Sequence, residues 1–177
     1  EAGLERWTGV PRMSALGRHL ARGLTLHTEV RVAALARSDG RWSLTDTEGR
    51  AHGPFDQVVL AIPAPQAAEL LVEHPAVHAQ VVGVSMHPVH TLLVEVEGAP
   101  SAAPAVLRPE GGPLGLLVRN SAKPGRPAGD CWVAHTRPPW SQQHLELEPA
   151  SLIADLVSAF REATGVAGSL SRCMVHR

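Results

Sequence analysis

Apolar and polar residues alternate in the region after residue 29, and this alternation predicts strands. Four small apolar residues are expected to share one side of the first strand: Val30, Val32, Ala34 and Ala36. A Ser-Asp-Gly turn at residues 38–40 precedes a second strand, in which Trp42 and Leu44 continue the alternation. The region is therefore predicted to form a β-meander.

The segment Val58–Ile62 differs from those strands because all five of its residues (VVLAI) are apolar. Such a run predicts a strand that is covered on both faces, as in a parallel sheet. Pro65 favours a helix start, and a short helix is predicted over residues 66–73, ending before Pro75. A buried strand followed by a helix is half of a parallel crossover unit, which is typical of a nucleotide-binding domain.

The end of this predicted strand is a candidate ligand site. In open α/β sheets, ligands bind at the carboxyl ends of the strands. The residues at this position are Ala61, Ile62 and Pro63, so we expect a ligand to approach them.

Helical spacing appears at two other places. Near the start, four apolar residues recur at intervals of three and four: Met13, Leu16, Leu20 and Leu24. Near the end, the stripe Leu152, Ile153, Leu156, Val157 and Phe160 predicts a helix over about 149–164. Gly165 is placed to end this second helix.

From about residue 80 the chain alternates between short apolar segments and turns rich in Pro and Gly. Strands are predicted for residues 84–98, 105–108, 114–120, 131–136 and 174–177. An antiparallel sheet with the late helix laid on it is the expected second domain.

Composition and charge exclude several classes of partner. The net charge is −1, and Lys and Arg form no stripe, which disfavours nucleic acid and anionic membranes. No apolar stretch approaches the roughly 20 residues that span a bilayer, and no signal-peptide pattern is seen. Cys131 and Cys173 lack metal-ligand spacing and are too few for a disulfide framework. We expect a soluble, cytoplasmic protein that acts on a small molecule.

The search for catalytic motifs identifies no self-sufficient active site. His74 and His78 have helical spacing, but Pro75 lies between them and no third ligand is adjacent, so no metal site is predicted. The chain has no G-x-S-x-G nucleophile turn and no glycine-rich phosphate loop. No catalytic residue is assigned.

Three segments, in this order and spacing, carry a family resemblance. They are residues 7–24 (WTGVPRMSALGRHLARGL), 55–71 (FDQVVLAIPAPQAAELL) and 132–149 (WVAHTRPPWSQQHLELEP). Together they resemble the middle of renalase-type flavoproteins, which belong to the amine-oxidase-like FAD-dependent superfamily. The resemblance extends over about residues 6–177.

The resemblance implies an α/β (α+β) architecture with two domains. Residues 1–78 would be part of a Rossmann-like FAD-binding domain with the β-meander. Residues 79–177 would be a substrate-binding domain, an antiparallel sheet with its covering helix at about 149–164. The implied activity is transfer of hydride from a reduced nicotinamide dinucleotide isomer, or from an amine, to the flavin, with reoxidation by O₂ to give H₂O₂. Because the cofactor performs this chemistry, no protein base is required.

The resemblance also implies roles for individual residues. Val32, in a V-x-x-L pattern with Leu35, is similar to the valine whose backbone meets the adenine ring of FAD. Ala61, Ile62 and Pro63 match the segment that passes close to the cofactor. His135 and Trp140 fall in the match to the substrate domain. Arg12 departs from the pattern, where glycine is usual, so a long cation either crowds a ligand there or is solvated.

Renalase-like flavoproteins open with a Gly-rich strand-turn-helix, and both this unit and the rear flavin segment are missing here. The partners of this chain would include those N- and C-terminal parts. We expect the isolated chain to be inactive and to bind FAD poorly. The alternative function is a noncatalytic interaction module derived from the substrate domain.

The substrate remains open between two classes at this stage. A dinucleotide would need phosphate donors such as Arg119, Lys123 or Arg126, whereas a cationic amine would need an aromatic cage or a carboxylate. The basic loop and the scarcity of aromatic residues favour the dinucleotide.

Overall fold

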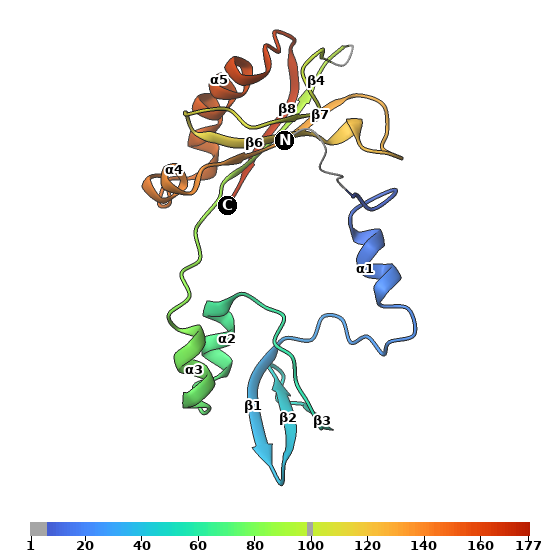
Figure 1. Ribbon diagram of the computed structural model, residues 1–177, viewed down its shortest axis with the longest axis vertical. Helices are drawn as coiled ribbons and strands as arrows, with labels where there is room; N and C mark the ends of the chain where they lie inside the picture. Colours follow the sequence, from blue (N-terminus) through green and yellow to red (C-terminus); the bar gives the residue numbers. More distant parts are fainter. Residues whose placement is uncertain (1–6, 99–100) are drawn as a thin grey trace. The chain divides into compact units, whose positions relative to one another are not determined.

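The computed structural model describes residues 7–98 and 101–177 (Figure 1). The described chain forms two compact units. We call residues 23–86 the meander unit, and residues 7–22 with 87–177 the sheet unit. Their assignment to a cofactor-binding and a substrate-binding domain stays a prediction.

The meander unit contains three antiparallel strands in the order β1-β2-β3, followed by two short helices. The elements are β1 (Val32–Ser38), β2 (Arg41–Asp46), β3 (Ala51–Phe55), α2 (Ala64–Leu70) and α3 (Pro75–Val81). The predicted meander and the helix after Pro65 are confirmed. At the first turn, Asp39 and Gly40 have φ of 51° and 80°, the left-handed conformation that tight hairpin turns favour.

Two strand predictions in this unit are wrong. In β1 the buried residue is Leu35, while Ala34 and Ala36 are exposed. The register of the β1–β2 pair shifts between Val32 and Ala34, and a shift of one residue turns the following side chains to the other face.

Val58–Ile62 forms no strand, and both sheets of the described chain are antiparallel. A parallel strand needs a neighbour to supply its hydrogen bonds. Val58 and Leu60 instead pack against the small core of Leu35, Ala67 and Leu71. Val59 is 86% exposed, so one side of the segment is not covered by the described residues.

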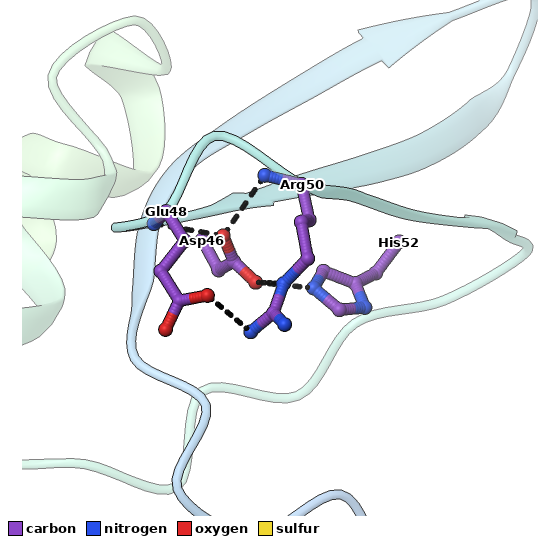
Figure 2. A network of polar contacts seen from close by, with 4 residues as sticks. All are labelled: Asp46, Glu48, Arg50 and His52. Atoms are coloured by element: carbon purple, nitrogen blue, oxygen red, sulfur yellow. Dashed lines mark hydrogen bonds and ion pairs between the residues drawn. The ribbon is translucent and has the colours of Figure 1, made fainter.

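A buried carboxylate holds the second turn of the meander (Figure 2). Asp46 Oδ1 accepts hydrogen bonds from the backbone N–H groups of Glu48 and Arg50, each at 2.9 Å. Asp46 Oδ2 lies 2.9 Å from both Arg50 Nε and His52 Nε2. These partners, His52 foremost, hold the pKa of Asp46 well below its ordinary range despite burial. The turn therefore depends on the ionised form of Asp46.

The sheet unit is built on five antiparallel strands in the order β5-β6-β7-β4-β8. The strands are β4 (Thr91–Val96), β5 (Val106–Leu107), β6 (Leu114–Arg119), β7 (Asp130–Thr136) and β8 (Leu170–His176). The helices are α1 (Ser14–Leu20), α4 (Pro138–Gln143) and α5 (Ile153–Thr164), with 3₁₀ turns at Asn120–Ala122 and Pro149–Leu152. The predicted strands and late helix are confirmed.

One face of this sheet carries the core. Leu92 and Val94 of β4 and Trp132 of β7 pack with Leu156 and Phe160 of α5. Gly165 ends α5 with φ of 69°, as predicted. No helix in the described ranges is long and apolar enough to cross a membrane.

Candidate functional site

The meander unit contains a cavity of about 560 Å³. Three residues assigned to the cofactor by resemblance, Val32, Ala61 and Ile62, line it. The structure thus brings together residues that lie about 30 positions apart in the chain. Pro63 does not line it and instead caps the N-terminus of α2 with extended backbone angles.

The cavity wall is mostly apolar. Aliphatic side chains form most of it, and Arg31, Gln66 and Glu69 supply polar groups. Ligand pockets of this size are commonly apolar with a few placed polar groups. Its residues therefore fit the adenine end of a flavin dinucleotide, while no glycine-rich phosphate turn contributes to this cavity.

A second cavity of about 420 Å³ in the same unit is almost wholly apolar. Val58, Leu60 and Ile62 line both cavities, so the segment borders open space on two sides. This arrangement accounts for the uninterrupted apolar sequence, although the segment is not a strand.

In the sheet unit, the two predicted substrate residues lie in different environments. His135 is on the β7 face that points away from α5, because its neighbours Ala134 and Thr136 are buried on the helix side. His135 Nδ1 lies 3.0 Å from Thr91 Oγ1 of β4. His176 of β8 also pairs with Thr91, so two histidines flank one hydroxyl on the open face of the sheet.

Trp140 lies on α4, a helix that the sequence analysis missed. Pro138 and Pro139 end the extended segment, and proline is also favoured in the first turn of a helix, where both residues lie in α4. The Trp140 indole stacks on His144, with ring centroids 3.9 Å apart, and makes an edge contact with His90 at 6.0 Å. His135 and Trp140 share no hydrogen bond or ring contact in the described chain, so the structure does not join them into one constellation.

A smaller cavity of about 220 Å³ lies on the open face of the sheet. Leu93, Val133 and Met174 form its apolar wall, and Glu95 and Arg172 contribute charged groups. Burial, and then the nearby carboxylates of Glu95 and Asp130, raise the pKa of the Cys131 thiol, which also lines this cavity. Cys131 is therefore a neutral thiol at physiological pH, not an activated nucleophile.

The basic residues assigned to phosphate binding differ in availability. Arg119 is committed to the fold, since Nη1 donates to the Ser101 carbonyl and its guanidinium lies 5.7 Å from the Trp132 ring centre. Lys123 and Arg126 are half-buried, and Arg126 Nε has no partner among the described residues. Arg12 is exposed, in agreement with the solvated alternative.

Comparison with known proteins gives the family. The model of the flavin-containing amine oxidoreductases matches residues 4–167. The chain belongs to this family. Renalase-like specificity within the family stays a prediction.

A solved structure supports the fold of this family member. The chain is similar to the crystal structure of the "putative protoporphyrinogen oxidase" of Exiguobacterium sp. 255-15, with a TM-score of 0.68. The two are 17% identical, and the match covers 93% of this chain and 38% of that chain. At this identity the likeness concerns the fold, which supports the α+β architecture.

Proposed function

We propose that the gene product containing this chain is a renalase-like, FAD-dependent oxidoreductase. The observation that carries this proposal is the cavity of the meander unit. In a flavin-containing amine oxidoreductase, residues from β1 and from the segment before α2 line one apolar cavity, namely Val32, Ala61 and Ile62.

In this proposal the cavity takes the adenine end of FAD. The Val32 backbone meets the ring, as the resemblance implies, Ile62 contacts it through an aliphatic side chain, and Ala61 leaves space for it because its side chain is a single methyl group. Gln66 and Glu69, one and two turns along α2, provide hydrogen-bonding groups at the rim. FAD, when bound, supplies the redox chemistry, accepting hydride from the donor and passing two electrons to O₂ to give H₂O₂. The chain's own residues bind the adenine end of FAD and orient it.

The proposed hydride donor is a reduced nicotinamide dinucleotide isomer. Lys123 and Arg126 support this class as half-buried cations, and Arg126 Nε has no hydrogen-bond partner within the described chain. An amine is the second candidate, favoured by Glu95, whose carboxylate lines the 220 Å³ cavity together with Arg172. The two classes differ in charge and can be distinguished by assay.

The cofactor proposal predicts that Ala61→Trp removes flavin from the protein. An indole at residue 61 would fill space that lines the 560 Å³ cavity. We expect flavin affinity to fall about 100-fold or more, the equivalent of about 3 kcal/mol of lost binding. Ala79→Trp is the matched control, because Ala79 is exposed on α3 and lines neither cavity.

Flavin retention is measured from the visible absorbance of the purified gene product, with folding checked by circular dichroism. Full flavin occupancy in a folded Ala61→Trp protein would contradict the assigned site. The donor is tested separately by anaerobic bleaching of the bound flavin with dihydronicotinamide isomers and with primary amines. A folded gene product that binds no flavin would favour the interaction-module alternative.

A further inference from the structure

His90 lies at the junction of β4, β7 and α4, and it is completely buried. Its backbone is held on both sides. The His90 carbonyl accepts from Thr136 N–H at 3.0 Å and from Thr136 Oγ1 at 3.1 Å. The His90 N–H lies 2.9 Å from Thr136 Oγ1 and 3.2 Å from Ser141 Oγ of α4. The position of α4 is therefore tied to that of His90.

The His90 imidazole has a different environment from its backbone. Within the described ranges, neither ring nitrogen has a hydrogen-bond partner. Trp140 packs against the ring at 6.0 Å, with the two planes at 85°. The ionisable groups whose charges act on the ring are both basic: His144 at the end of α4 and Arg177 after β8. Arg177 is itself fixed near α4, because its Nη1 donates to the Leu145 carbonyl at 2.6 Å.

We propose that His90 is a proton-sensitive positioning residue, which holds α4 and its Trp140 side chain in place only while its imidazole is neutral. A neutral imidazole buries one unpartnered N–H group. An imidazolium would bury two N–H donors and a full charge, beside Arg177 and close to His144. Movement of α4 would give the charged ring access to water, because Trp140 of α4 packs against it.

The same surroundings determine how pH changes the equilibrium between α4 held in place and α4 displaced. Burial first, and then the fields of Arg177 and His144, lower the pKa of His90 below its ordinary value of 6.5. The arrangement in which α4 is held against His90 therefore binds fewer protons than the arrangement in which α4 has moved away. Its stability is complete above about pH 6.5 and falls as the pH drops toward the lowered pKa of His90.

If α4 moves, Trp140 moves with it, and this would change substrate binding. That effect rests on the proposed function, because Trp140 is a substrate residue only in that proposal. The proton-dependent movement of α4 does not depend on flavin or substrate. It is therefore tested on the full 177-residue chain without cofactor, so that its failure can be distinguished from failure of the proposed function.

The experiment follows Trp140 fluorescence between pH 8 and pH 5. The Trp140 signal is obtained by subtracting the spectrum of the Trp140→Phe variant from that of its parent. Three parents are compared: wild type, His90→Phe, which keeps an aromatic ring but does not titrate, and His144→Gln. Wild type and His144→Gln are expected to show a step with a midpoint below 6.5, and His90→Phe is expected to show none.

A second measurement covers the case in which His90→Phe does not fold. Amide hydrogen exchange of residues 137–144 in the wild-type chain, corrected for intrinsic rates, is expected to be about tenfold faster one pH unit below the midpoint than one pH unit above it. A step that persists in His90→Phe, or that disappears in His144→Gln, would overturn the proposal. So would wild-type fluorescence and exchange that do not change over this range.

Discussion

Replacing Phe160 with alanine is expected to lower the unfolding free energy of the sheet unit by about 3–5 kcal/mol, the usual cost of removing a buried aromatic ring. Phe160 is completely buried in α5. Its ring meets Trp132 of β7 edge-on, with centroids 5.7 Å apart. The substitution leaves a cavity where α5 meets the sheet, and both Leu156 and Trp132 lose packing contacts in the same cluster.

Urea unfolding followed by the fluorescence of buried Trp132 would measure this effect. With a typical urea dependence for a small protein, the midpoint should fall by about 2 M. Phe55→Ala is the matched control, because Phe55 is 40% exposed on β3 of the meander unit. We expect it to leave the unfolding of the sheet unit unchanged. A loss below about 1 kcal/mol in Phe160→Ala would mean that the site repacks without the ring.

The sheet unit could be predicted from sequence because its strands obey a simple rule. β4 and β7 each have one face against α5 and one open face, so burial alternates, as in Leu92, Val94 and Val96. In a half-buried antiparallel strand, the alternation of apolar and polar residues shows which face is toward the core. The α5 stripe is equally local, because it depends on spacing along one helix.

The meander unit shows where this rule stops. The exposure of Ala34 and Ala36 depends on a register shift, which leaves no mark in apolar or polar patterning. Val58–Ile62 has the composition of a covered strand, but strand formation depends on a partner that its own residues do not specify. Local composition therefore specifies neither the hydrogen bonding of this segment nor the exposure of Val59.

The candidate site residues also differ in how far the sequence could predict them. Val32, Ala61 and Ile62 were connected by family resemblance, and the structure adds that they line one cavity. His90 was predicted only as a strand residue. Its burial follows from alternation, but its two unpartnered nitrogens depend on α4, which was not predicted.

Replacing Asp46 with asparagine is expected to destabilise the meander unit strongly. This unit has a core of only three fully buried apolar residues, so its turns contribute a large share of its stability. Asparagine can still accept from the Glu48 and Arg50 backbone N–H groups. Its amide nitrogen, however, would face Arg50 Nε and His52 Nε2, which now lie 2.9 Å from an oxygen. The ion pair with Arg50 is lost, and His52 can remain a partner only as an acceptor in its neutral form.

The pH dependence of the wild type has a definite sign. Because the pKa of Asp46 is lowered in the folded state, its stabilising contribution is present above the ordinary aspartate pKa of about 4 and is lost as the pH falls below it. In Asp46→Asn this contribution is absent at every pH. Wild type should therefore approach the stability of the variant as the solution becomes more acidic.

Amide hydrogen exchange of residues 32–55 isolates this effect from the sheet unit. At pH 7, protection of the three strands is expected to be much lower in Asp46→Asn than in wild type. Asp39→Asn is the matched control, because Asp39 is exposed in the neighbouring turn and asparagine tolerates its positive φ. Equal protection in wild type and Asp46→Asn would show that the backbone of the turn, and not the carboxylate network, holds the meander together.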